Sequence, residues 1–333
     1  MIEYAAIDLF AGAGGLSLGL HAAGIKSVMA VEIVPDAAET YQGIFPDVEV
    51  CRKDIRAVDF RQWRGVDVVA GGPPCQPFSI GGLRRGRNDQ RDFLPEFVRA
   101  VLEVRPRAFL MENVPGLASF GPYLETVLAP LRDLYTVAQP QVINAADFGV
   151  PQQRRRLIVV GSRDGFDFKL SPSMPGQQMP AGSVLTAEPR GEPNPSKIVF
   201  AKRPDLRPNP YHGHLFNGGG RAIDLGKPSP TMLAAAGGNK THFLDLEGLI
   251  PAYHRHLRSG GAPYVGELPG ARRITVLESA ALQSFPEEVR FAGSRSSQYR
   301  QVGNAVPPRL AQAISEALLE QVLGRSSRKR MAA

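Results

Sequence analysis

The chain has 333 residues, 43% of them hydrophobic, with 39 Lys and Arg against 32 Asp and Glu and a formal net charge of +7. This composition argues against a disordered chain, and the length suits one large domain and one smaller domain. No apolar run approaches the roughly 18 residues of a membrane span, and the N-terminus lacks the basic segment of a signal peptide. We therefore expect a cytoplasmic protein with no membrane partner, whose basic charge favours a polyanion such as nucleic acid.

The expected elements alternate in the first half of the chain. Strand-like apolar runs are at 4–10, 27–32, 66–70, 108–111 and 156–161, and helix-like stretches are at 16–23, 35–45 and 93–104. Alternation of this kind predicts a parallel α/β sheet covered on both faces.

Proline and glycine become dense after about residue 163, and helical periodicity returns only at 275–285 and 307–323. We expect a first domain at 1–163, a small loop-rich domain at 164–270, a return segment at 271–325 and a basic tail at 326–333.

A glycine-rich turn, DLFAGAGGLSLG (8–19), follows the first expected strand. Its glycines allow positive φ angles and close approach of a ligand. Ser17 stands where the dinucleotide fingerprint has Gly or Ala, and no Gly-Lys-Ser/Thr follows, which excludes a P-loop. Glu32 is placed to accept hydrogen bonds from ribose hydroxyls, Asp54 to accept from an adenine amine, and Phe10 to stack on a purine. Together they predict a ligand that contains adenosine without a pyrophosphate.

Only two cysteines are present, Cys51 and Cys75, which is too few for a disulfide framework. No Cys/His cluster has the spacing of zinc ligands, so we expect no metal. Cys51 is interpreted as structural, as most buried cysteines are. Cys75 differs because rigid prolines flank it in GGPPCQPFS (71–79), directly after an expected strand, where open α/β sheets bind ligands. Adjacent backbone N–H groups and nearby arginines favour its thiolate.

The segment GPPCQPFS resembles the nucleophile motif of bacterial cytosine-C5 DNA methyltransferases of the restriction–modification type. The family's other motifs follow in order over nearly the whole chain. They are the S-adenosylmethionine loop at 8–19, the Glu-Asn-Val at 112–114, the Gln-x-Arg-x-Arg at 152–156, the penultimate motif at 273–286 and the last motif at 301–307. PTMLAAAGG (230–238) is similar to the Thr-Leu element of the family's target recognition domain, with Met232 in place of the usual Leu.

The resemblance implies a Rossmann-like, S-adenosylmethionine-dependent methyltransferase fold with a mixed sheet and a smaller, loop-rich target recognition domain at 164–270. Because the last motif completes the cofactor site, the helix at 307–323 is expected to fold back onto the N-terminal domain.

The resemblance also implies three groups of site residues. The catalytic group is Cys75, Glu112, Asn113, Arg154 and Arg156. The group that binds S-adenosyl-L-methionine is Asp8, Phe10, Gly12, Gly14, Gly15, Glu32, Asp54, Ile55, Pro74, Asn304, Ala305 and Val306. The group that contacts DNA is Ser79, Arg84, Arg85 and Arg87 in a lid at 79–93, with Asn217, Arg221, Thr231 and Met232 in the recognition domain.

These residue types suit the reaction, in which carbon 5 of cytosine is too weak a nucleophile until a thiolate adds at carbon 6. A protonated Glu112 can donate to N3, Arg156 can hold O2, and Asn113 can orient the loop that carries Cys75. Each also has a structural interpretation: Glu112 can pair with an arginine, residues 154–156 can be a solvated basic run, and Asn304 can be a turn residue.

The expected partner is double-stranded DNA with a flipped-out cytosine, the expected state is a monomer associated with the nucleoid, and a cognate restriction endonuclease would be encoded elsewhere. Three alternatives stay open. One is a tRNA cytosine-C5 methyltransferase of the same family, another is a DNA-binding regulator without catalysis, and the third is an NAD dehydrogenase, which Ser17 disfavours.

Overall fold

The computed structural model describes residues 4–74, 92–174 and 176–324. Five expected site residues and the basic tail lie outside these ranges; the five are Cys75, Ser79, Arg84, Arg85 and Arg87. The chain forms two compact units, each described by itself. Unit 1 comprises Met1–Gly149, Arg155–Gly176 and Ala305–Ala333, and unit 2 comprises Val150–Arg154 and Gln177–Asn304.

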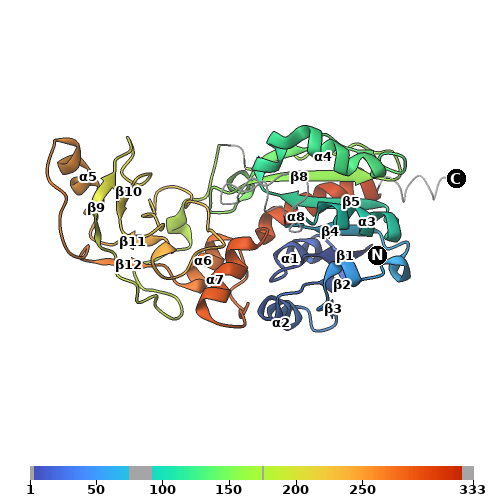
Figure 1. The fold of residues 1–333 in the computed structure, drawn as a ribbon, viewed down its shortest axis with the longest axis horizontal. Helices are drawn as coiled ribbons and strands as arrows, with labels where there is room; N and C mark the ends of the chain where they lie inside the picture. The colour runs from blue at the N-terminus through green and yellow to red at the C-terminus, as the bar shows by residue number, and fades with distance from the viewer. Residues whose placement is uncertain (1–3, 75–91, 175, 325–333) are drawn as a thin grey trace. The chain divides into compact units, whose positions relative to one another are not determined.

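Unit 1 is built on an eight-stranded sheet whose main order is β3-β2-β1-β4-β5-β8-β6, with β7 also paired to β8 (Figure 1). The strands are β1 (Tyr4–Leu9), β2 (Ile25–Val31), β3 (Glu49–Cys51), β4 (Val68–Gly71), β5 (Ala108–Asn113), β6 (Thr136–Val137), β7 (Gln141–Asn144) and β8 (Arg155–Ser162). Strands β1 to β5 are parallel, and β8 runs antiparallel to β5, β6 and β7.

The mixed sheet confirms the fold class that the resemblance implied. The fully parallel sheet expected from strand–helix alternation alone was wrong, because alternation carries no information on the direction of β8.

Helices cover both faces of this sheet. They are α1 (Gly15–Ala22), α2 (Pro35–Ile44), α3 (Leu94–Val104), α4 (Gly121–Leu128) and α8 (Pro308–Leu318), which continues as a π-helical turn at Leu319–Leu323. Ile7 and Leu9 of β1 belong to the core under α3 and α4, together with Phe97 and Leu124. Strand side chains alternate between faces, so Asp8 points to the opposite side, where it meets α1.

Helix α8 packs against α1, as predicted for the return of the chain. Gly19 makes this contact possible, because a Cβ added there would lie 2.3 Å from Ala311 Cβ and 2.4 Å from the backbone nitrogen of Gln312. Beyond α8, Arg107 holds the π-helical turn by donating from Nη2 to the Leu323 carbonyl over 2.8 Å.

Gly19→Ala is therefore expected to lower the free energy of unfolding of unit 1 by about 1–3 kcal/mol, the usual cost of overpacking. Gly43→Ala is the matched control, since no atom lies within 4 Å of its added Cβ and Ala favours a helix by up to about 1 kcal/mol. Trp63, the only tryptophan, lies in unit 1, so its fluorescence in a urea titration reports on this unit. Equal midpoints for wild type and Gly19→Ala would contradict the α1–α8 contact.

Unit 2 is loop-rich, with two short antiparallel strand pairs and three α-helices among its described residues. The elements are β9 (Phe200–Asp205), β10 (His214–Phe216), β11 (Phe243–Asp245), β12 (Ala271–Arg273), α5 (Ile250–Arg258), α6 (Val276–Leu282) and α7 (Arg295–Asn304). Its main core is aromatic and gathers Phe200, Phe216, Phe243 and Tyr253.

The expected return segment, 271–325, is divided between the two units. Residues 271–304 cluster with unit 2, and the chain re-enters unit 1 at Ala305. Strand β12 pairs with β11, and the buried Arg273 donates from Nη1 to the Thr241 carbonyl over 2.6 Å. The helix expected at 275–285 begins with a capping box between Thr275 and Glu278 and ends at Leu282. Ser284, at φ 62°, breaks it.

In the described part of the chain no helix is both long and apolar enough to cross a membrane.

Candidate active site

Glu112 lies at the carboxyl end of β5 and is 8% exposed. Arg156, on the adjacent strand β8, donates from Nε to its Oε1 over 2.7 Å. Burial lowers the pKa of Arg156, and the carboxylate of Glu112 opposes that shift. The structure thus joins two of the expected catalytic side chains at one strand end. It also shows the arginine pairing that was the structural interpretation of Glu112.

The segment leading to Cys75 passes directly beside this pair. A Cβ on Gly72 would lie 3.1 Å from Glu112 Oε2, so a glycine lets the chain approach the carboxyl group closely. Asn113 donates from Nδ2 to the Pro73 carbonyl over 2.9 Å, and its Oδ1 accepts from the backbone of Val114 at 2.8 Å. Cys75 itself lies outside the described residues, but the residue two positions before it is held by Asn113.

The far side of the segment is anchored at the same place. The carbonyl of Pro74, an expected cofactor residue, accepts a hydrogen bond from the Phe93 backbone over 3.2 Å. The described residues that flank 75–91 are therefore neighbours.

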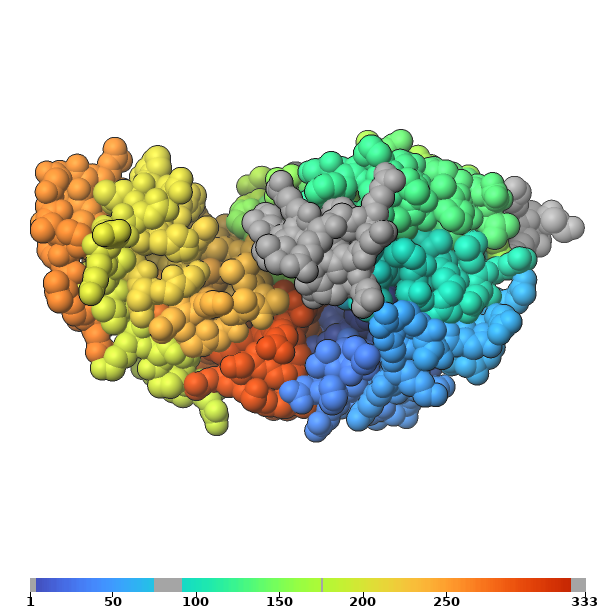
Figure 2. Space-filling view, viewed as in Figure 1, coloured from blue at the N-terminus to red at the C-terminus, as the bar shows by residue number. Residues whose placement is uncertain are grey.

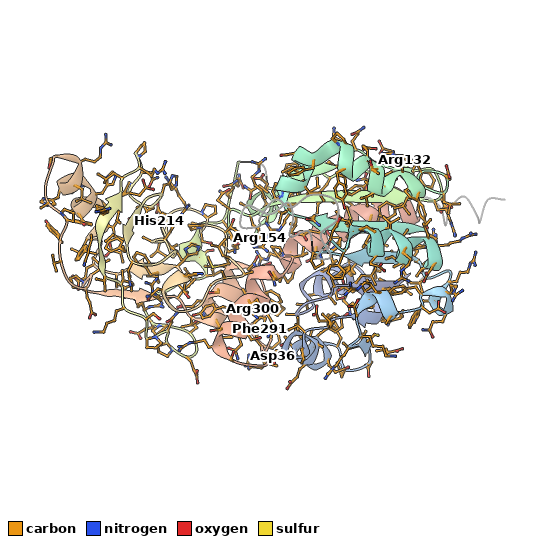
Figure 3. The ribbon with its side chains drawn as sticks, viewed as in Figure 1. Asp36, Arg132, Arg154, His214, Phe291 and Arg300 are labelled. Carbon is orange, nitrogen blue, oxygen red and sulfur yellow. The ribbon has the colours of Figure 1, made fainter. Side chains whose placement is uncertain are left out.

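Arg154, labelled in Figure 3, belongs to unit 2 and is fully buried. Its Nη1 donates to the Met232 carbonyl over 3.1 Å and its Nη2 to the Gly303 carbonyl over 2.8 Å. These contacts tie three distant segments together. A catalytic role for Arg154 stays a prediction, and the contacts themselves are those of a positioning residue.

The glycine turn after β1 leaves open space at Gly12. Gly12 and Gly14 have φ angles of +56° and +81°, where side chains are disfavoured, and no atom lies within 4 Å of a Cβ added to Gly12. The Gly12 backbone donates to Glu32 Oε2 over 2.8 Å, and Val34 donates to Oε1 over 2.7 Å. Burial raises the pKa of Glu32, while these two backbone donors partly offset the shift. Gly15 begins α1 directly after the turn.

Phe10 has a φ angle of 57°, which is unusual for a bulky residue and persists only where the surrounding structure enforces it. Its ring meets Phe93 edge-on, with centroids 5.8 Å apart. Both oxygens of Asp54 accept hydrogen bonds from Arg56, which lowers the pKa of Asp54 to about 2. These side chains fit the aromatic surface and the ionised acceptor that an adenine would need.

The side chains of two expected cofactor residues are buried. The Ile55 side chain is 4% exposed and packs in the core under α3. The Asp8 carboxyl is 1% exposed and faces α1, where Oδ2 accepts from Ser17 Oγ over 2.7 Å. Both side chains are buried by neighbouring elements, so a contact of either residue with cofactor stays a prediction. Of the C-terminal group, Asn304 is the exposed last residue of α7, whereas Ala305 and Val306 are buried.

Of the DNA-contacting residues expected in the recognition domain, one is buried and two make hydrogen bonds to the backbone. Met232 is 2% exposed and packs in a core cluster, and its expected contact with DNA stays a prediction. Thr231 donates from Oγ1 to the Gln153 carbonyl over 2.5 Å. Asn217 accepts from the Val199 backbone at 2.9 Å and donates to the Lys197 carbonyl over 3.2 Å.

His242 was missed by sequence reasoning, although it connects two expected DNA residues. Its Nδ1 accepts from the Arg221 backbone at 2.9 Å, and its Nε2 lies 3.2 Å from the Thr231 carbonyl. Burial lowers the pKa of His242 to about 4, so the ring is neutral at pH 7, with the proton on Nε2. His242 belongs to none of the sequence motifs. Its lowered pKa results mainly from burial, which the sequence does not reveal.

The central glycine turn, the sheet order and the carboxyl-edge pair of Glu112 and Arg156 define an α/β methyltransferase of the Rossmann-like class. The C-5 cytosine-specific DNA methylase family matches residues 4–192 and 235–320. The chain belongs to this family and is a DNA (cytosine-5)-methyltransferase. The family uses S-adenosylmethionine.

Relatives align over nearly the whole chain. Type II methyltransferase M1.HphI of Haemophilus parahaemolyticus is 35% identical over 328 residues, which cover 94% of this chain and 86% of the relative. Type II methyltransferase M.AplI of Arthrospira platensis is 35% identical, with coverage of 97% and 87%. The crystal structure of a Spodoptera frugiperda DNMT2 mutant aligns with a TM-score of 0.70 at 17% identity, covering 95% of this chain and 100% of that chain, which supports the fold.

Proposed function

We propose that this enzyme methylates a flipped-out cytosine in a short site of double-stranded DNA, as the modification enzyme of a type II restriction–modification system. Relatives at 35% identity are named type II methyltransferases, and a cognate endonuclease would be encoded separately. The observation that carries the mechanism is the placement of Glu112, Arg156 and the Asn113–Pro73 tether at one strand edge.

In the proposed reaction, the Cys75 thiolate forms a bond to carbon 6 of the cytosine. The C5=C6 electron pair shifts toward C4, and the C4=N3 pair takes up a proton at N3 from the Glu112 carboxyl group, so no anion accumulates on the ring. Arg156, 2.7 Å from Glu112, fixes the carboxyl group and presents positive charge beside the ring.

Bound S-adenosylmethionine supplies an electrophilic methyl group to carbon 5. A base then removes the proton of carbon 5, the C5=C6 bond forms again as the Cys75 thiolate leaves, and N3 returns its proton to Glu112. The open turn at Gly12, the Glu32 carboxyl beneath it and Phe10 are the described residues that fit the cofactor.

The test is covalent trapping. Duplex DNA with 5-fluorocytosine at the target has no proton to lose at carbon 5, so the Cys75 adduct is expected to accumulate and to survive denaturing electrophoresis when the methyl donor is added. The target is first located by bisulfite sequencing of DNA from expressing cells. Cys75→Ala should give no adduct, and Cys51→Ala should give the wild-type amount.

Absence of an adduct with the wild-type enzyme would contradict the covalent route. A tRNA transcript added as competitor tests the substrate class, because the proposal requires duplex DNA to be methylated in preference to it.

A further inference from the structure

A cleft of about 360 Å³ lies in unit 2, at the exit of β9 and the start of β10. Its lining residues are polar or charged apart from one proline: Asp205, Arg207, Pro208, His212, His214 and Arg221. The surrounding chain, yellow-green to yellow in Figure 2, is at the surface of the unit. The C-5 methylase family matches residues on either side but not 193–234. Every lining residue falls in that interval, where this chain differs from what the family shares.

The backbone around the cleft is firmly held. His214 pairs with Asp205 in the β9–β10 ladder (His214 is labelled in Figure 3), and a Cβ on Gly213 would lie 2.2 Å from the Asp205 carbonyl. The Arg207 carbonyl lies 2.7 Å from Nε2 of the buried His254. The Arg221 backbone donates to the buried His242, as described above. The backbone of Arg207 is therefore held by His254 and that of Arg221 by His242.

The Arg207 side chain is oriented from one end only. Its Nε donates to Asp205 Oδ2 over 3.0 Å, with the two side chains 60% and 43% exposed. An ion pair this exposed adds little to the free energy of unfolding, and its effect is to fix the orientation of the Arg207 guanidinium group. Among the described residues no hydrogen-bond partner is found for the two terminal nitrogens of Arg207, and its side chain is exposed, which leaves a two-pronged donor accessible to a ligand.

Such a fork matches the O6 and N7 acceptors of guanine in the major groove. A phosphate would fit less well, because the Asp205 carboxylate beside the fork repels an anion, whereas the base edge is neutral. We propose that Arg207, oriented by Asp205, binds a guanine of the recognition sequence and so determines specificity at that base pair. This inference rests on the proposed action on duplex DNA.

The experiment uses the full chain and the site that wild-type enzyme methylates in sequenced DNA. Each guanine of that site is replaced in turn by 7-deazaguanine, which lacks the N7 acceptor, and kcat/KM is measured for wild type, Arg207→Ala and the control Arg203→Ala. Arg203 is an exposed residue of β9 outside the cleft.

At one guanine we expect the base analogue to lower kcat/KM of wild type by about 10- to 100-fold. Arg207→Ala should show a similar loss on natural DNA and little further loss with the analogue at that position, because both changes remove the same hydrogen bond. Arg203→Ala should respond to the analogue as wild type does. A wild-type response of Arg207→Ala to the analogue at the other guanines of the site verifies that unit 2 of the variant is folded.

Two results would overturn the inference. One is an Arg207→Ala variant with wild-type kcat/KM and wild-type sensitivity at every guanine. The other is a uniform loss at all positions with a salt dependence reduced by about one charge, which is the behaviour of a phosphate contact. Absence of DNA methylation by the wild type would instead refute the proposed function, so the two failures are distinguishable.

Discussion

Replacing Glu112 by Gln should lower the single-turnover rate of methyl transfer by about 100- to 10,000-fold, the range expected for loss of a general acid. The amide keeps the size of the side chain but has no acidic proton to transfer to N3. The measurement is rapid quench with saturating DNA and cofactor, so that binding does not contribute to the rate.

The control for this variant is Glu125→Gln. Glu125 also pairs with an arginine, Arg132, over 2.6 Å, but this pair is on the surface with the Glu125 side chain 55% exposed. Its loss should leave the methylation rate unchanged. A Glu112→Gln rate within threefold of wild type would contradict the assignment of Glu112 as the acid.

Glu112→Gln also weakens the buried pair with Arg156, so a structural effect has to be separated from a chemical one. Loss of the pair alone would lower the unfolding midpoint of the variant. Loss of the acid lowers the single-turnover rate even at temperatures well below that midpoint, where the variant is fully folded.

The sequence could predict the central strands of unit 1 because β4, β5 and β8 are continuous apolar runs, as strands buried on both faces are. The same continuous apolar pattern does not show toward which face of the sheet a given side chain points. Nothing in the pattern around Asp8 shows which face of β1 it occupies, since Ile7 and Leu9 on the other face are buried as well.

Elements held by distant contacts were not predictable in this way. Helix α7 has almost no apolar periodicity, and its buried Tyr299 is fixed by a 2.6 Å hydrogen bond to the Ile274 carbonyl. Unit 2 likewise depends on isolated buried polar residues such as His242 and Arg273. Its motif residues were recognisable, but the cleft around Arg207 required the fold to bring Asp205 and His214 into register.

The buried carboxyl group of Asp8 is expected to make unit 1 less stable as the pH rises. Ser17 Oγ contacts Asp8 Oδ2, and also lies 2.9 Å from Ser27 Oγ and 2.7 Å from the Tyr41 hydroxyl. Oδ1 has no hydrogen-bond partner among the described residues. Burial, with a smaller contribution from the charge of Glu32, raises the pKa of Asp8 from 3.8 to about 7.

The sign follows from proton uptake. Below about pH 4 the group is protonated in the folded and unfolded chains alike, so the folded state carries no penalty. Between pH 4 and pH 7 only the folded chain keeps the proton, and stability falls by about 1.4 kcal/mol per pH unit. Above pH 7 both states are ionised, and the accumulated loss levels off at about 4 kcal/mol, an upper bound for this burial.

Asp8→Asn removes this dependence because the amide stays neutral and its Oδ1 can still accept from Ser17. Its free energy of unfolding should exceed that of wild type at pH 8.5 by about 2 kcal/mol more than at pH 5.5. Trp63 fluorescence in urea reports the difference within unit 1, and Asp133→Asn, at an exposed turn residue, is the control that should follow wild type at both pH values. Parallel pH profiles for wild type and Asp8→Asn would show that Asp8 is ionised in the folded protein. The turn that begins the cofactor site would then rest on a charged hydrogen-bond network rather than a neutral one.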